Sequence, residues 1–319
     1  MILARHAEAL YWVGRYLERA ETTARCLDVA DASIMHLRVA EAETEWFQLV
    51  KALGLQDEFT AADGRPTQGS VARFLLGAHA SPGSVRASVA AVRDNLRVAR
   101  DRVPIELWEE ANRLFLLLRD IDVGALGGEV HDTLVTVRRG CQAMSGVVGE
   151  AMVRDEGHGF IVIGRMSERA ILTVDLLSAA LGSGRVFDAD RLLRSASALQ
   201  AFRRRHGYDT DWVTVADFLI LDSDTPRSVL SCLRRIEDRL ARFDRAGTLR
   251  RPRRLAGRLR SEVEFGDLAE ALEADPFAHL AQLAAGIIEV AASVQAHVVP
   301  PIATPEMHSQ FVRPGRRAP

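Results

Sequence analysis

The chain has 319 residues, of which 48% are hydrophobic and 26% are charged, and its formal net charge at pH 7 is −2. This composition excludes a disordered chain and a multi-spanning membrane protein, and the balanced charge gives no general attraction to nucleic acid or anionic lipid. Charged residues interrupt the apolar residues of the N-terminal segment, so we expect no signal peptide, no membrane association and a cytoplasmic location.

Cysteine and lysine are both rare. Cys26, Cys141 and Cys232 lack the paired spacing of a zinc site, and their odd number suits reduced, buried thiols. Of the 41 basic residues only Lys51 is lysine. A GC-rich genome explains this bias most simply; the alternative is that arginine forks recognise carboxylate or phosphate groups.

Helical periodicity runs through almost the whole chain. Apolar residues recur at intervals of three and four, beginning between Ala9 and Leu27, and patterns typical of strands are nearly absent. Turn-forming residues interrupt the pattern at 54–69, 80–83, 102–104, 124–128, 156–159, 182–188, 207–211, 223–226 and 247–252. We therefore predict an all-α fold, a helical bundle of about ten helices.

A charged motif occurs twice, as Gly-Arg-Tyr-Leu-Glu-Arg-Ala at 14–20 and as Gly-Arg-Met-Ser-Glu-Arg-Ala at 164–170. A second match joins 71–75 to 215–219, and each copy is followed by a serine, Ser84 or Ser228, that we predict caps a helix. One duplication explains both matches.

The duplication predicts two tandem, pseudo-symmetric repeats. The first covers residues 1–148 and the second residues 149–298, packed on each other as one domain about an axis that brings the two motif helices together. Residues 299–319 are rich in proline and arginine, and we predict a flexible tail there.

The charged motifs are predicted to be at least partly buried. On a helical wheel the charged face of the first motif also carries Tyr11 and Trp12, which a water-exposed face does not need. The second motif has apolar neighbours around its arginines. Buried charges must be paired, because stripping each ion of water is costly.

Two interpretations of the motifs remain open. In the structural one, each glutamate pairs with arginines of the other motif and locks the halves in register. In the functional one, the arginines clamp an anionic carboxylate or phosphate ligand in a cleft, while a glutamate holds them or takes a proton. The structural pairs would be Glu18 with Arg165 or Arg169, and Glu168 with Arg15 or Arg19. The candidate catalytic residues are Glu18 and Glu168, and the candidate ligand-binding residues are Arg5, Glu8, Tyr11, Trp12, Arg15, Arg19, Asp155, Glu156, His158, Arg165 and Arg169.

A small polar cluster precedes the second motif. Asp155, Glu156 and His158 either mark an ordinary turn between helices or contribute to acid–base chemistry or metal binding. The turn is the simpler explanation.

Arginines are densest in two other segments. They form either a solvated face or a docking site for an acidic partner or a phosphate-bearing substrate, and the scarcity of nearby aromatic residues argues against nucleic acid. The residues concerned are Arg203, Arg204, Arg205, Arg250, Arg251, Arg253 and Arg254.

Sequence signatures of cofactor binding are missing. There is no P-loop, dinucleotide-binding glycine fingerprint, HExxH or GxSxG motif, and the nine histidines show no ligand spacing. We expect no metal and no cofactor on this chain; ATP, if the system uses it, would be bound by a partner.

The motif segments resemble a known family. Residues 5–21, 154–157 and 201–207, together with 108–109, 112–114, 215–221, 226–228 and 254–259, look like the alpha-E domain family, so the resemblance covers almost the whole chain. The family is named for its helical character and its glutamate-arginine motif, here Glu18-Arg19 and Glu168-Arg169. The chain departs from the family pattern at Ser167, where a bulky apolar residue is usual, and at His158-Gly159, where an aromatic residue followed by a basic one is usual.

The resemblance implies a context more than a reaction. Alpha-E proteins typically occur beside, or fused to, a circularly permuted ATP-grasp protein, often with a transglutaminase-like protein nearby. The first hypothesis is therefore an accessory or partner subunit of a circularly permuted ATP-grasp ligase that makes or modifies a peptide or amide bond, with a Glu-Arg cleft contacting substrate or partner. The second is an enzyme in its own right, with Glu18 or Glu168 as general acid or base. The third is a purely structural scaffold.

Overall fold

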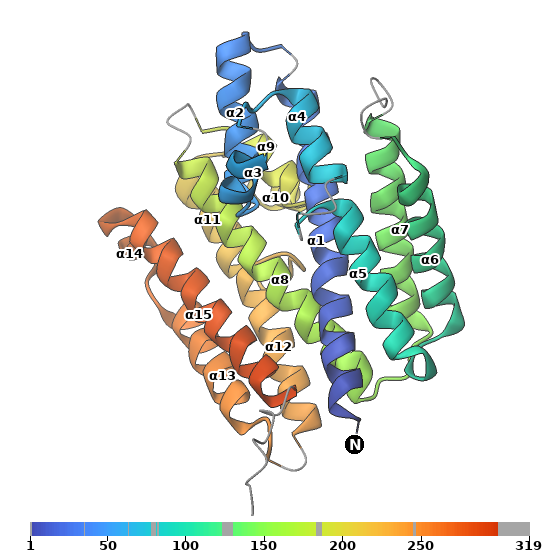
Figure 1. The fold of residues 1–319 in the computed structure, drawn as a ribbon. Helices are drawn as coiled ribbons and strands as arrows, with labels where there is room; N and C mark the ends of the chain where they lie inside the picture. Colours follow the sequence, from blue (N-terminus) through green and yellow to red (C-terminus); the bar gives the residue numbers. More distant parts are fainter. Residues whose placement is uncertain are drawn as a thin grey trace, which may run out of the picture.

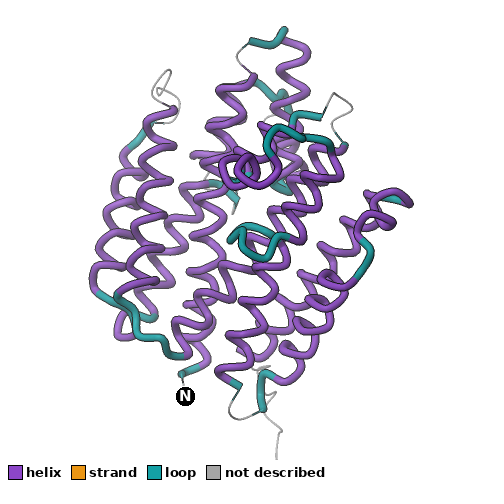
Figure 2. The backbone as a smooth tube through the Cα atoms, turned by 180° about the vertical axis from the view of Figure 1, so that it is seen from behind, coloured by secondary structure: helices purple, strands orange, loops and turns teal. Residues whose placement is uncertain are grey.

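The computed structural model describes residues 2–34, 36–62, 64–77, 81, 83–122, 130–182, 187–244 and 247–298. These residues form an all-α structure with no strand (Figure 2). The predicted tail at 299–319 lies outside the described residues. The predicted fold class is confirmed.

Two long helices occupy the middle of the bundle, α1 (Ala4–Ile34) and α8 (Glu156–Leu181) (Figure 1). They pack more extensively against each other than any other pair of helices does. On the α1 side lie α5 (Val85–Val98), α6 (Ile105–Asp120) and α7 (Val130–Glu150), and on the α8 side lie α12 (Val229–Phe243), α13 (Arg250–Phe265) and α15 (Pro276–Val298). The motif helices therefore form the centre of the fold, while the duplication itself stays a prediction.

Shorter helices gather mainly around one end of the bundle (Figure 1). The prediction of about ten helices was too low, because the described residues contain fifteen α-helices, several of only one or two turns. Most of the shorter ones lie within stretches that the sequence marks as turns or just beside them, whereas the helix at 268–274 does not. The shorter helices are α2 (Val39–Ala52), α3 (Gln56–Ala62), α4 (Gln68–Ala72), α9 (Ala189–Ser195), α10 (Leu199–His206), α11 (Trp212–Leu221) and α14 (Leu268–Ala274), together with the π-helix Arg73–Gly77 and the 3₁₀ turn Arg100–Arg102.

Side-chain caps fix where the helices of the core begin. Ser84 accepts a hydrogen bond from the Ala87 N–H at the start of α5, and Ser228 accepts one from the Ser231 N–H at the start of α12. Both predicted serine caps are confirmed. Each satisfies a backbone donor that the first turn of a helix leaves unpaired.

Glycine makes the close crossing of α1 and α8 possible. A Cβ atom added to Gly14 would overlap the carbonyl oxygen of Ile161, and one added to Gly164 would overlap the carbonyl oxygen of Tyr11. The two contacts are reciprocal, since each motif glycine faces the backbone of the other helix. Any larger residue would force the helices apart.

The three cysteines are buried and free, as the sequence predicts. Burial raises the pKa of all three thiols, that of Cys232 to about 11. They therefore remain neutral thiols at physiological pH and act as small apolar residues of the core.

The helix α15 has an unusual surface. Of the described helices it alone is long and apolar enough to cross a membrane, by length and composition only, and core helices of bundles pass the same test. It packs against α8, α13 and α14. Its outward side carries exposed apolar residues, namely Phe277, Ala278, Ala281, Ala285, Ile288 and Ala292.

Replacing Gly14 with alanine should destabilise the protein. The added methyl group meets backbone rather than a movable side chain, so we expect a loss of about 3 kcal/mol in the free energy of unfolding, measured by urea denaturation. Gly146→Ala is the matched control, because nothing lies within 4 Å of its Cβ position in α7. It should stabilise the protein by about 0.5–1 kcal/mol. Equal effects of the two substitutions would contradict the close crossing.

Candidate functional site

Glu18 lies at the centre of the α1–α8 contact with no exposure to solvent. Arg169 holds it through two bonds, with Nε 2.9 Å from Oε1 and Nη2 2.6 Å from Oε2. The Arg165 Nε lies 2.9 Å from Oε2, and the Arg227 Nη1 lies 2.8 Å from Oε1. One buried carboxylate is thus surrounded by three guanidinium groups.

Glu21 extends this arrangement by one helical turn. Its Oε2 accepts from Arg165 Nη2 at 3.2 Å and its Oε1 accepts from Arg227 Nη2 at 3.1 Å. Arg25 pairs with the same Oε1 from the next turn of α1. Arg165 and Arg227 therefore each bridge Glu18 and Glu21.

Glu168 forms the second half of the site, with an exposure of only 3%. The Nε of Arg15 and the Nε of Arg19 each donate to a different oxygen of its carboxylate, the latter at 2.6 Å. The cross-pairing predicted by the structural interpretation is therefore present in both directions. We call Glu18, Glu21, Glu168 and their arginine partners the ER network.

The network changes the acid–base behaviour of its members. Burial alone would raise the pKa of Glu18, but Arg169, Arg227 and Arg165 hold that pKa well below its ordinary value of 4.5. Burial, together with smaller effects of the nearby Arg25 and Arg169, lowers the pKa of Arg227 to about 10. Glu18 is thus a permanently ionised carboxylate whose oxygens already accept four hydrogen bonds, a state that suits ion pairing better than proton transfer.

Aromatic residues cover the outer side of the Glu168 pair. The Tyr11 hydroxyl accepts a hydrogen bond from Arg15 Nη1 at 2.9 Å, and the rings of Trp12 and Tyr16 stack with centroids 5.2 Å apart. The Arg15 guanidinium lies 5.8 Å from the Trp12 ring. Tyr11 is 1% exposed, whereas Trp12, Tyr16 and the two arginines that bind Glu168 are half-buried and reach the surface here.

The polar cluster before the second motif mainly builds the start of α8. Asp155 caps the helix by accepting from the His158 N–H, and Glu156 accepts from the Ile2 N–H at 2.5 Å. His158 is 2% exposed and borders Arg154, with Nη1 to Nε2 at 3.2 Å. Burial, followed by Arg154 and Arg239, lowers the pKa of His158 to about 4, so the ring is neutral at physiological pH.

Two other candidate ligand residues stand at the beginning of α1. Arg5 is exposed and its Nε lies 3.4 Å from the His6 ring, while Glu8 is half-buried. Neither joins the ER network.

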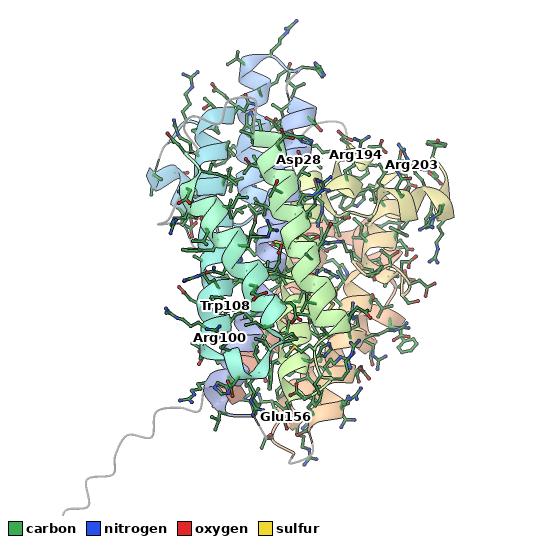
Figure 3. The ribbon with its side chains drawn as sticks, turned by 90° about the vertical axis from the view of Figure 1, so that its right-hand side faces the viewer. Asp28, Arg100, Trp108, Glu156, Arg194 and Arg203 are labelled. Carbon is green, nitrogen blue, oxygen red and sulfur yellow. The ribbon has the colours of Figure 1, made fainter. Side chains whose placement is uncertain are left out.

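The two arginine-rich segments do not form one surface. Arg203 pairs with Asp190 at 2.7 Å, and Arg205 pairs with Asp222 and Asp224. Figure 3 shows Arg203 towards the opposite end of the bundle from Glu156, and α13 begins near the Glu156 end (Figure 1). The remaining basic side chains are exposed, namely Arg204, Arg250, Arg251, Arg253 and Arg254.

Several important residues were missed from the sequence. Arg227, Glu21 and Arg25 complete the ER network, and the one available signal was their position beside the motif or beside a serine cap. Asp175, two turns after Glu168 on α8, has its pKa raised to about 7 by burial and by Glu168. Within the part of the chain that the structure describes, no group of three or more His, Cys, Asp or Glu residues is placed to hold a metal ion.

Three comparisons relate the chain to known proteins. The model of the Alpha-E family, described as a predicted alpha-helical domain with a conserved ER motif, matches residues 2–298. The uncharacterized protein Mb2597 of Mycobacterium bovis is 27% identical over 305 residues, and the uncharacterized protein Rv2567 of Mycobacterium tuberculosis is 26% identical over 305 residues. These matches cover 87% of this chain but 34% of each relative, so the chain spans about a third of their length. No solved structure matches the chain significantly.

Glu18→Gln should strongly destabilise the fold, because it leaves three buried or half-buried arginines without their shared anion. We expect a loss of about 3–5 kcal/mol in the free energy of unfolding at neutral pH. Since the folded-state pKa is depressed, the stability that Glu18 contributes is present above the ordinary value of 4.5 and fades as the pH falls below it.

The matched control is Glu262→Gln, which breaks an exposed pair with Arg258 at 3.2 Å. Its effect should stay below about 1 kcal/mol. Chemical denaturation of both variants at neutral and acidic pH checks this prediction, and a Glu18→Gln protein as stable as the control would contradict it.

Asp175→Asn should stabilise the protein in a pH-dependent way. The folded-state pKa is raised to about 7 from 3.8, so folding opposes ionisation and wild-type stability falls as the pH rises through this interval. The increase in the free energy of unfolding that the asparagine gives over the wild type should therefore grow by about 2 kcal/mol between about pH 5 and about pH 8. Thermal and urea unfolding across this range test it, and a gain independent of pH would show that Asp175 titrates normally.

Proposed function

This chain belongs to the Alpha-E family, and we propose that it is a helical accessory subunit acting with a circularly permuted ATP-grasp protein in a system that forms or modifies a peptide or amide bond. The curated relatives support this proposal, because the matched segment is about a third of each longer protein and so works there beside other polypeptide. The identity of the partner rests on the family resemblance. A transglutaminase-like protein is a second candidate member of the same system.

Within this proposal the ER network holds the helices α1 and α8 together and is not a reaction centre. Its glutamates face arginines of the opposite motif helix, and the Glu18 carboxylate is fully buried. A substrate carboxylate or phosphate would have to displace these internal anions. The arginine edges that reach the surface, such as Arg19, are half-exposed and remain available to a partner.

The observation that carries the proposal is the exposed apolar side of α15. A helix face with several exposed apolar residues commonly marks a protein interface. Beside it lies a groove of about 430 Å³ between α13 and α15. Its lining combines apolar residues, including Leu255, Leu259, Val263, Leu283 and Val290, with the polar residues Arg258, Glu262, His279, Gln282 and Glu289. We assign the ATP-grasp partner to this face.

The enzyme alternative gains support from one residue. Asp175 is a largely buried carboxyl group with a pKa near 7, a property that general acids and bases need, and Glu168 acts on it electrostatically. Under this alternative, Asp175→Asn and Glu168→Gln would abolish turnover of the reconstituted system while leaving the partner bound. Under the accessory proposal, Asp175→Asn leaves turnover intact.

Co-expression with a circularly permuted ATP-grasp protein tests the partnership. We expect the two proteins to co-purify and to elute together in size-exclusion chromatography at micromolar concentration. Ile288→Asp, which places a charge on the apolar side of α15 where the side chain is 53% exposed, should weaken the complex by about tenfold or more.

The matched control is Ile105→Asp, a similar substitution at a side chain that is 48% exposed at the start of α6. It should leave the complex unchanged. Failure of the two proteins to co-purify would refute the partnership. Equal binding by both variants would refute the assignment of the α15 face, and a change in self-association alone would assign this face to a second copy of the chain.

A further inference from the structure

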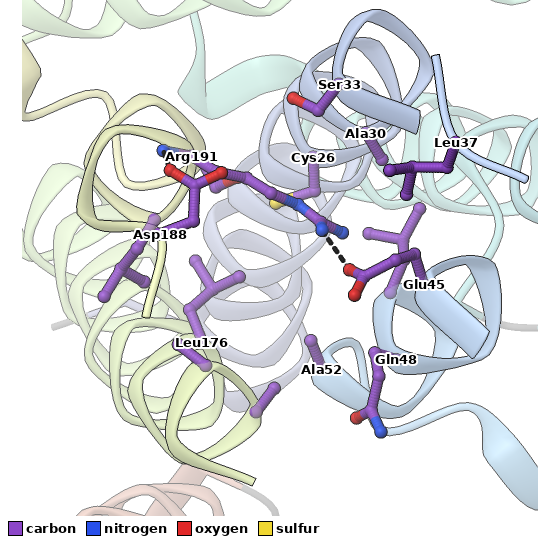
Figure 4. Close-up of a pocket in the computed structure, with 15 residues that line it drawn as sticks. Cys26, Ala30, Ser33, Leu37, Glu45, Gln48, Ala52, Leu176, Asp188 and Arg191 are labelled. Carbon is purple, nitrogen blue, oxygen red and sulfur yellow. Dashed lines mark hydrogen bonds and ion pairs between the residues drawn. The ribbon is translucent and has the colours of Figure 1, made fainter. Parts of the chain in front are cut away.

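A pocket of about 210 Å³ lies between α1, α2, α8 and α9, and no glutamate of the ER network lines it (Figure 4). The helices α2 and α9 each pack on both α1 and α8, and the pocket occupies the space between them. Its volume is below the roughly 300–1,000 Å³ of sites for drug-sized ligands. A ligand here must be a small molecule.

An ion pair crosses the pocket. Glu45 on α2 is 5% exposed, and its Oε2 accepts from Nη1 of Arg191 on α9 (Figure 4). The Arg191 side chain keeps 24% exposure, so its guanidinium borders the open space. A buried carboxylate and a partly exposed guanidinium group therefore face the same small volume.

A neighbouring amide is left unsatisfied. The Oε1 atom of Gln48, one turn after Glu45 on α2, is buried and has no hydrogen-bond partner within the described part of the chain. A buried acceptor without a donor is energetically unfavourable. An N–H group of a ligand would satisfy it once the Gln48 amide turns towards the pocket that this side chain lines.

Much of the remaining wall is apolar. The other polar lining residues are Ser33, Ser195 and Asp188, whose carboxylate accepts from the backbone N–H of Arg191 at 2.9 Å and so caps α9. Alanine and leucine side chains form the apolar walls, and the Cys26 thiol, whose pKa burial raises, remains neutral beside them. The apolar residues are Ala30, Leu37, Leu49, Ala52, Leu176, Ala179, Ala180 and Leu192. These apolar walls suit an aliphatic group.

We propose that this pocket binds a free α-amino acid with an aliphatic side chain. Its ammonium group donates to Glu45 and Gln48, its carboxylate accepts from the guanidinium of Arg191, and its side chain packs on the alanine and leucine walls. A carboxylate accepts several hydrogen bonds and a guanidinium donates five, so the Glu45–Arg191 pair need not break completely. This inference does not depend on the ATP-grasp partnership, because the isolated chain contains the whole pocket.

Isothermal titration calorimetry of the isolated full chain with L-leucine tests the inference. We expect saturable binding, weakened by about tenfold or more in N-acetyl-L-leucine, which lacks the ammonium group, and in L-leucinamide, which lacks the carboxylate. The absence of saturable binding to L-leucine at millimolar concentration would overturn the proposal. Equal binding of either derivative would overturn the zwitterion assignment.

A variant that fills the pocket separates this site from others. Ala179→Leu places three extra carbon atoms in the pocket at a half-buried position, so it should abolish leucine binding while the protein stays folded by circular dichroism. Ala90→Leu, at a half-buried position of α5 that does not line the pocket, is the control and should bind leucine as the wild type does. Undiminished binding by Ala179→Leu would show that leucine binds elsewhere.

Discussion

The close approach of α1 and α8 is the constraint on which the rest of the structure depends. Gly14 and Gly164 each face the backbone of the opposite helix, so the two axes lie nearer than ordinary side chains would allow. At this separation, an arginine on one helix reaches the glutamate of the other across the crossing. The glycine and the charged residues of each motif therefore act together. The glycine sets the distance between the helices, and the charged residues fill the space beside the glycine contact.

The composition of the ER network explains why the position of each charge matters. Three buried acids face a larger number of arginines. Burial is the main cause of the lowered pKa of Arg227, and the neighbouring Arg25 and Arg169 contribute to it. Loss of a glutamate increases the imbalance, whereas loss of an arginine reduces it. Apolar residues in the same place would have packed as well and would not have specified the register of two similar helices. The network includes Glu18, Glu21 and Glu168 with Arg15, Arg19, Arg25, Arg165, Arg169 and Arg227.

Periodicity was sufficient for the fold class. A helical wheel places the motif charges on a face that Tyr11 marks as covered, which favoured cross-pairing but left ligand binding open. Periodicity was insufficient for Arg227, whose guanidinium reaches Glu18 only after α12 has packed on α8. The helix count was too low because helices of one or two turns are too short to repeat an apolar pattern. The Glu45–Arg191 pocket was invisible for a related reason: four helices separated along the chain supply its lining, and no local pattern joins them.

The ER network is linked to the pocket between α1, α2, α8 and α9 through Arg25. Arg25 pairs with Glu21 in the network, and its Nη1 lies 3.4 Å from the backbone oxygen of Ser195, which lines the pocket. The ER network thus helps to hold α9 in place, and α9 carries Arg191, which lines the pocket. A rigid ionic core is well suited to this task, since its ions are satisfied internally and do not compete for a ligand. Ligands and partners can then bind at the ends and the outer face of the central helices, where side chains remain exposed to solvent.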